Sequence, residues 1–161
     1  MVVDAAGRRG TGFHNDGDPA VVVRAGQPRR AVEGCDIVVT AGPILHTPHA
    51  TIKAGWLQPG AFVSSLDYDS YWDRPALHEV DEFCTDDIPQ SQHYQRLGYF
   101  QDVPPIYATL GELVAGKKPG RQSDRERTVT CNLGLALDDI ATAPLVYRAA
   151  VQRGLGSRLA L

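Results

Sequence analysis

The class of the fold follows first from residues Gly34–Ala41, which read GCDIVVTA. Within this stretch, Asp36–Thr40 is an apolar, β-branched run, and turn residues follow it at Gly42 and Pro43. β-branched residues favour strands, and a run without polar alternation is typical of a parallel strand buried on both faces. We therefore predict that 36–40 is an inner strand of a parallel sheet.

Short strand-like and helix-like segments alternate along the chain on both sides of this strand. Further strands are expected over 20–25 (AVVVRA), 61–66 (AFVSSL) and 83–85, and helices over 28–33, 75–80, 87–97 and 109–115. Such alternation predicts an α/β layer built around a parallel sheet. Residues 1–18 are rich in Gly, Asp and Arg and show no lasting periodicity, so we expect them to be poorly ordered.

The last predicted element is a long helix that stands apart from this rhythm. Apolar residues recur mostly three or four positions apart, at Leu133, Leu137, Ile140, Ala141, Leu145 and Ala149. The helix is expected over 133–152, and Gly154 and Gly156 follow it. Pro144 lies inside it, and we expect this proline to kink the helix or divide it in two.

Composition and charge narrow the function classes. The 161 residues suffice for one domain of ordinary size. The net charge is −3, so the chain lacks the excess of basic residues that is typical of proteins that bind nucleic acid. The basic stretch 117–127 is interpreted as a solvated loop, with a phosphate contact as the alternative. Three widely spaced cysteines indicate neither a zinc ribbon nor a disulfide framework, and no apolar run is long enough to cross a bilayer. We expect a cytoplasmic protein without nucleic-acid or membrane partners.

Two strand ends could carry chemistry, because ligands of open parallel sheets bind at the carboxyl ends of the strands. Thr40 to Pro43 offers a hydroxyl and small residues, although a tight turn explains the same residues. Asp67 and Asp69 follow the strand 61–66, and the alternative there is a solvated acidic turn. If the two carboxylates lie close together, repulsion and desolvation would raise one pKa, as a general acid requires.

Two other kinds of site receive less support. His46 and His49 have the HxxH spacing of a helical metal site, but Pro48 argues against a helix. A metal-dependent hydrolase using these histidines with Asp67 and Asp69 is therefore only a third hypothesis. No GxGxxG follows a strand anywhere in the chain, so the usual phosphate-binding turn of a dinucleotide fold is missing.

Five blocks in order and spacing resemble the ornithine cyclodeaminase/mu-crystallin family. They are GCDIVVTA, GWLQPGAFV, the acidic strand end, LGELVAGKKPGRQSD and NLGLALDDIATAPLVYRAAVQRGLG, which together cover about 30–156. TAGPILHTPHATIKAGWL and LDYDSYW are also similar to a branch described as a tyramine oxidase accessory subunit.

The resemblance implies an α/β fold with a partial Rossmann-type parallel sheet. It divides the chain into a partial dinucleotide-binding domain over 19–130 and, over 131–161, a helix that returns to a missing substrate and dimerisation domain. It implies NAD or NADP as cofactor, an amino or imino acid as substrate, hydride transfer as the reaction, and a homo-oligomer. We expect this chain alone to bind NAD weakly and to have no turnover.

The resemblance also implies roles for individual residues. Asp69 matches the aspartate that exchanges protons with the substrate nitrogen, and Leu133 lies near the substrate. The expected cofactor contacts are Thr40, Ser65, Leu66, Asp67, Tyr68 and Asn132, the stretch 65–68 contributing largely through its backbone. Metal ligands are not expected.

The chain departs from the family pattern around this site. Asp67 and Tyr68 replace residues that are usually small, Asp73 replaces a lysine, and Asn132 replaces a serine, so ornithine is not expected as the substrate. The glycine-rich turn and the cationic substrate-binding residues have no counterpart here. The alternative to an enzyme is a non-catalytic partner subunit or a small-molecule binding protein of the mu-crystallin type.

Overall fold

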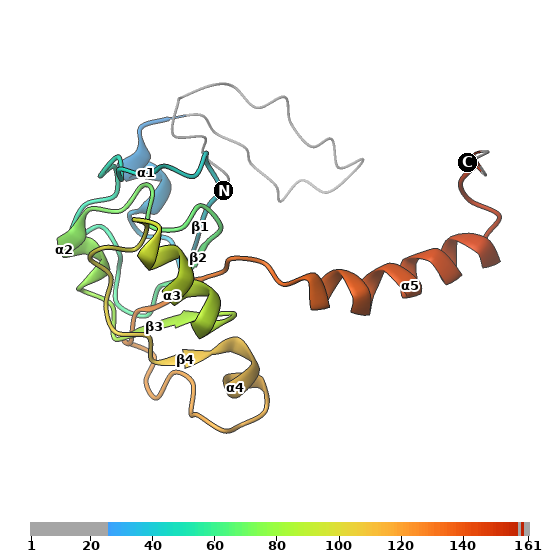
Figure 1. The fold of residues 1–161 in the computed structure, drawn as a ribbon. Coiled ribbons are helices and arrows are strands. Elements are labelled where there is room, and N and C mark those ends of the chain that lie inside the picture. The colour runs from blue at the N-terminus through green and yellow to red at the C-terminus, as the bar shows by residue number, and fades with distance from the viewer. Residues whose placement is uncertain (1–25, 158, 160–161) are drawn as a thin grey trace.

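The fold is built on a five-stranded sheet of parallel strands. The computed structural model describes residues 26–157 and 159, so the predictions for 1–18 and 20–25 lie outside the described residues. The strands are β1 (Ile37–Thr40), β2 (Phe62–Ser65), β3 (Glu82–Thr85), β4 (Ala108–Thr109) and β5 (Thr128–Cys131). Their spatial order is β1-β2-β5-β3-β4. Strands β1 and β4 therefore lie at opposite edges of the sheet (Figure 1). The predicted α/β class with a parallel sheet is confirmed.

Short helices connect the strands. They are α1 (Pro28–Val32), α2 (Arg74–Leu77), α3 (Ile88–Arg96) and α4 (Leu110–Val114). The caps explain two of their starts: Asp87 accepts the Gln90 N–H at 2.6 Å at the start of α3, and Thr109 with Glu112 forms a capping box at the start of α4. These helices agree with the predicted ranges to within a few residues.

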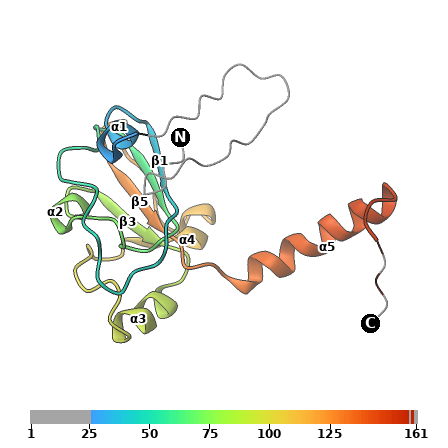
Figure 2. The same ribbon diagram turned by 90° about the horizontal axis from the view of Figure 1, so that it is seen from above.

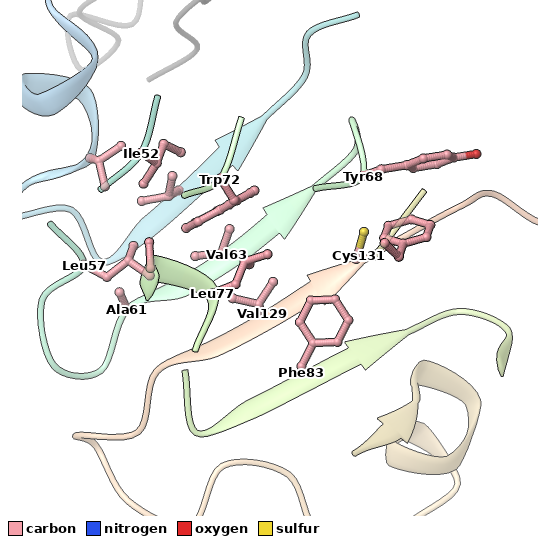
Figure 3. Close-up of a cluster of buried hydrophobic side chains, with 14 residues drawn as sticks. Ile52, Leu57, Ala61, Val63, Tyr68, Trp72, Leu77, Phe83, Val129 and Cys131 are labelled. Carbon is pink, nitrogen blue, oxygen red and sulfur yellow. The ribbon is translucent and has the colours of Figure 1, made fainter. Parts of the chain in front are cut away.

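The hydrophobic core lies on one face of the sheet. Val63 and Val129 lie in register on neighbouring strands and are fully buried. Leu77 of α2 and the ring of Trp72 pack over them (Figure 3). Val32 of α1 belongs to the same cluster, so the helix before β1 and the segments after β2 cover one face together.

Strand β5 was missed by the sequence prediction, and β1 is less buried than predicted. Thr128–Cys131 inserts between β2 and β3, which precede it in the chain. On β1, Val38 is buried, but Ile37 is 65% exposed and Val39 is 36% exposed. The expectation of burial on both faces is therefore wrong for the described part of the chain, because β1 lies at an edge of the sheet and packs on one face only.

Helix α5 (Ala136–Gln152) extends away from the sheet, as Figures 1 and 2 both show. It is one continuous helix of 17 residues with Pro144 inside it, so of the two predicted effects of Pro144 the division is wrong and the kink stays a prediction. It begins three residues later than predicted, because Gly134 has a left-handed backbone (φ 87°) and ends the preceding extended segment. None of its described residues is buried. Among the described residues, no helix combines the length and the apolar character needed to span a bilayer.

Candidate functional site

The carboxyl ends of the strands form a straight row of mostly polar residues. Thr40 pairs with Ser65, Ser65 with Cys131, Cys131 with Thr85, and Thr85 with Thr109. Because every strand is parallel and ends at the same level, these side chains and the loops after them meet at one edge. This is the edge where open parallel sheets bind their ligands.

The buried carboxylate of Asp67 organises one end of this row. It is 1% exposed. It accepts the Thr40 hydroxyl at 2.5 Å and the Gly42 N–H at 2.9 Å, and the Ser65 hydroxyl lies 3.1 Å away. Ser65 also accepts the indole N–H of Trp72 at 3.2 Å, which anchors the row to the core. Thr40, Ser65 and Asp67, which were predicted separately, therefore form one hydrogen-bonded group.

A small cavity of about 50 Å³ lies beside Asp67, between α1 and the end of β1. Its lining is otherwise uncharged and includes Gly42 and Tyr71. Gly42 must be glycine, because a Cβ there would overlap the ring of Tyr71. The phenol of Tyr71 donates to the Pro43 carbonyl at 3.1 Å and so fixes the turn after β1.

Asp69 lies on the other side of the same strand end. It is 8% exposed, and burial raises the pKa of its carboxyl, although backbone N–H groups of Asp69 itself and of Phe100 oppose the rise. A narrow internal space next to it is also lined by Cys131, and the nearby Asp69 carboxylate adds to the burial that raises the pKa of that thiol. Asp67 is not among the causes of the Asp69 shift. Of the two causes predicted for a raised pKa in this acidic pair, desolvation is confirmed and repulsion by the second carboxylate is not among the causes.

Tyr68 separates the two carboxylates. Its backbone is left-handed (φ 61°), which is uncommon for a residue with a side chain. Its ring packs at 4.8 Å from Phe100, 5.4 Å from Tyr94 and 5.7 Å from Tyr99, measured between ring centroids. The buried ring holds the turn in place, and burial also raises the pKa of its phenol.

The segment that leads from β5 into α5 contributes the remaining predicted residues. Asn132 donates its backbone N–H to the Ser65 carbonyl at 3.2 Å and accepts the Thr130 hydroxyl at 2.7 Å. The N–H of Leu133 donates to Asp86 at 2.8 Å. Leu66 is 49% exposed and lies at the same edge. All eight predicted site residues therefore lie at the ends of β1, β2 and β5 or in the loops that directly follow them.

Asp86 is a site residue that the sequence analysis missed. Its carboxylate at the end of β3 accepts N–H groups from Leu133 and from Gly134, the latter at 2.6 Å. The sequence TDD at 85–87 carried the same signal as the acidic end of β2, an acid directly after a strand.

The two histidines do not join the acidic residues. His46 stacks on Tyr99 with the ring centroids 4.3 Å apart, and Nδ1 of His49 lies 2.9 Å from the Thr51 hydroxyl. Within residues 26–157 and 159, no group of three or more His, Cys, Asp or Glu side chains could hold a metal ion. The geometry therefore gives no support to the metal-dependent hydrolase.

Comparison with known proteins identifies relatives of this chain. The family model described as ornithine cyclodeaminase/mu-crystallin matches residues 15–154. An alanine dehydrogenase of Archaeoglobus fulgidus is 30% identical over 145 residues, which cover 83% of this chain and 43% of that protein. The chain thus spans less than half the length of this relative.

Solved structures with the same fold also bind nicotinamide cofactors. The Delta(1)-pyrroline-2-carboxylate reductase of Thermococcus litoralis, in complex with NADH and L-proline, is 27% identical with a TM-score of 0.62. An archaeal alanine dehydrogenase dimer with bound NAD is 27% identical with a TM-score of 0.61. Each match covers 83% of this chain and 43% of the solved chain.

Proposed function

Because the chain belongs to the ornithine cyclodeaminase/mu-crystallin family, we propose that it forms part of an NAD(P)-dependent oxidoreductase acting on an amino or imino acid. In the oxidative direction a hydride leaves the α-carbon, the nitrogen loses a proton, and a C=N bond forms. NAD or NADP supplies the hydride acceptor. The reverse direction reduces an imino acid.

One observation carries this proposal: a buried carboxyl with a raised pKa, Asp69, lies at the ligand-binding edge of a parallel sheet. Desolvation brings the pKa of an acid closer to neutrality, which suits a group that takes up and returns a proton. Asp69 would accept the proton that the substrate nitrogen loses and donate it in the reverse reaction. Leu133, at the start of the segment after β5, would contact the substrate.

The strand-end row offers contacts for the nicotinamide half of the cofactor. Leu66 and Asn132 follow neighbouring strands and are partly exposed, so backbone groups there would be accessible to a ligand. The pyrophosphate half normally needs a glycine-rich turn at a helix N-terminus, and no GxGxxG follows a strand in this chain. We assign 19–130 to the cofactor domain and 131–161 to the substrate and dimerisation domain.

The proposed activity belongs to a complete protein, since the chain spans 43% of the archaeal alanine dehydrogenase. For the isolated chain, we expect weak NAD binding and no turnover. Calorimetry with NAD and with NADP measures the first expectation. A dissociation constant below micromolar would show that the phosphate turn is dispensable.

A chimera tests the function itself. Residues 15–154 replace the matching segment of the archaeal alanine dehydrogenase, and NADH oxidation is followed with small imino acids. In the chimera, we expect Asp69→Asn to reduce kcat at least a hundredfold with cofactor binding retained. A matched control is Asp36→Asn, which alters an exposed carboxylate just before β1 that accepts the side-chain amide of Gln58 at 2.7 Å and should change kcat little.

A second candidate function is a non-catalytic partner subunit or binding protein, and the Asp67 contacts favour it. The Thr40 hydroxyl and the Gly42 N–H already donate to the Asp67 carboxylate, so neither donor is free to bind a cofactor. If Asp69→Asn leaves every activity of the chimera unchanged, the binding role replaces the enzymatic one.

We further propose that the protein is a cytoplasmic homo-oligomer. Apolar side chains of α5 are exposed along its whole length, including Ile140, Leu145 and Val151. Cys35, Cys84 and Cys131 are free thiols, which suits a reducing compartment. Sedimentation of the chain should show oligomers that Leu145→Glu dissociates, and a monomer at all concentrations would contradict the assembly.

A further inference from the structure

Two hydrogen-bond donors converge on the carboxylate of Asp67. One is the hydroxyl of Thr40 at the end of β1, and the other is the backbone N–H of Gly42 in the turn after β1. They lie 2.5 and 2.9 Å from its oxygens. The Ser65 hydroxyl is 3.1 Å from the same carboxylate, but it donates its one proton over the shorter distance of 2.6 Å to the Tyr68 carbonyl. Donors fixed by strands and by a tight turn are preorganised, so they define an acceptor site whichever carboxylate fills it.

The surroundings of this acceptor site resemble a ligand site. It lies at the carboxyl edge of a parallel sheet, and the adjoining cavity of about 50 Å³ has no other charged residue in its lining. This volume holds about one or two water molecules. The carboxylate of Asp67 is 1% exposed and lies next to this otherwise uncharged cavity. It therefore occupies the position expected for the polar group of a bound molecule.

We propose that the side chain of Asp67 fills a site that would otherwise bind a small carboxylate. We also propose that its negative charge restricts access of the cofactor to the end of β1. The part of the proposal that concerns the cofactor rests on the proposed function. The side chain withholds the donors of Thr40 and Gly42 from any ligand. It also places a negative charge in a region of low dielectric, which repels an anionic dinucleotide.

An ordinary loop-ordering aspartate would explain the same hydrogen bonds. The two explanations differ in what happens when the side chain is removed. Removing a loop-ordering residue leaves a disordered turn, whereas removing an occupant of a ligand site leaves two aligned donors, from Thr40 and Gly42, around a vacant position. Only the second arrangement takes up a free carboxylate.

Thermal melting of the isolated chain with formate tests the site. For Asp67→Ala, we expect 100 mM formate to raise Tm at least 3 °C above the value in chloride of equal ionic strength, because binding to the folded state stabilises it. Wild type and the control Asp36→Ala, which removes a carboxylate that accepts the neutral side-chain amide of Gln58, should respond equally to both salts. Adding Thr40→Val to Asp67→Ala removes one donor and should abolish the formate effect.

Two outcomes would overturn the proposal that Asp67 fills a carboxylate site. One is equal stabilisation of Asp67→Ala by formate and chloride. The other is a variant that stays unfolded at every formate concentration, because a vacated site of this kind must accept formate. Formate that restores cooperative melting to an otherwise unfolded variant supports it.

Calorimetry with NAD tests whether Asp67 restricts binding of the cofactor. Asp67→Asn keeps the shape of the side chain and removes its charge, so we expect it to bind NAD at least tenfold more tightly than wild type. The exposed control Asp36→Asn should bind NAD as wild type does. Equal affinity of Asp67→Asn and wild type overturns the restriction. Neither experiment depends on hydride transfer in the chimera, so failure here is distinct from failure of the proposed function.

Discussion

Replacing Asp86 with alanine perturbs the connection between the sheet and α5. The carboxylate accepts the N–H groups of Leu133 at 2.8 Å and Gly134 at 2.6 Å, which lie 47 and 48 residues further along the chain. It also accepts the N–H of Asp87 at 3.0 Å and the Thr85 hydroxyl at 3.2 Å. The two long-range bonds hold the segment that follows β5 against the end of β3.

The expected loss of stability follows from these bonds. A hydrogen bond to a charged group contributes about 1.5–3 kcal/mol when it is shielded from water. The N–H of Gly134 is exposed and the two local donors can bind water instead, so the lower end of that range applies. We expect Asp86→Ala to lower the free energy of unfolding by about 2–4 kcal/mol.

Urea unfolding followed by the fluorescence of Trp56 and Trp72 measures this loss, and hydrogen exchange locates it. The amides of Leu133 and Gly134 should exchange at least tenfold faster in the variant. Asp87→Ala is the matched control: it removes the cap of α3 at a cost of about 1 kcal/mol and leaves both amides unchanged. If the amides of Leu133 and Gly134 exchange equally slowly in Asp86→Ala and in wild type, the carboxylate of Asp86 does not hold this segment.

Three further predictions address the site and the core. The raised pKa of Asp69 means that its protonated form contributes to the free energy of unfolding, and this contribution is complete at pH values below 3.8, the ordinary pKa. The contribution is lost as the pH rises through the raised pKa of the folded state. Asp69→Asn should therefore gain stability relative to wild type between pH 4 and pH 8 in urea titrations, and a constant difference would contradict the shift. Val63→Ala should cost about 2–3 kcal/mol in the same assay, because Val63 is fully buried, and a cost below about 0.5 kcal/mol would show loose packing. Gly42→Ala should lower Tm by overlap with Tyr71, and Tyr71→Ala in the same chain should recover part of the loss.

Local patterns predicted most of the fold. The β-branched run at 37–40 predicts its strand locally, the strand at 62–65 follows the turn residues Pro59 and Gly60, and capping residues define α3 and α4. Strand β5 was missed although it is as long as β2 and has three β-branched residues. Its place between β2 and β3 depends on pairing with both strands, and the local sequence does not specify that pairing.

The site was predicted in its location and not in its internal arrangement. An acid after a strand is visible in the sequence, so Asp67 and Asp69 were both found. Their different environments depend on the left-handed backbone of Tyr68, which directs one carboxylate to Thr40 and the other toward Cys131. That conformation is stabilised by packing of the Tyr68 ring against residues more than 20 positions away, which no local pattern encodes.

Transfer of deuterium from the cofactor shows whether hydride transfer occurs at the carboxyl edge of this sheet, as we propose. The chimera that carries residues 15–154 is incubated with NADH bearing deuterium at C4, with a small imino acid, and the amino acid product is examined by mass spectrometry. We expect one deuterium at the α-carbon from one of the two C4 stereoisomers of the label, and far less product when Asp69 is replaced by Asn. An amino acid without deuterium from either stereoisomer, or no amino acid from a folded chimera that binds NADH, would contradict the claim.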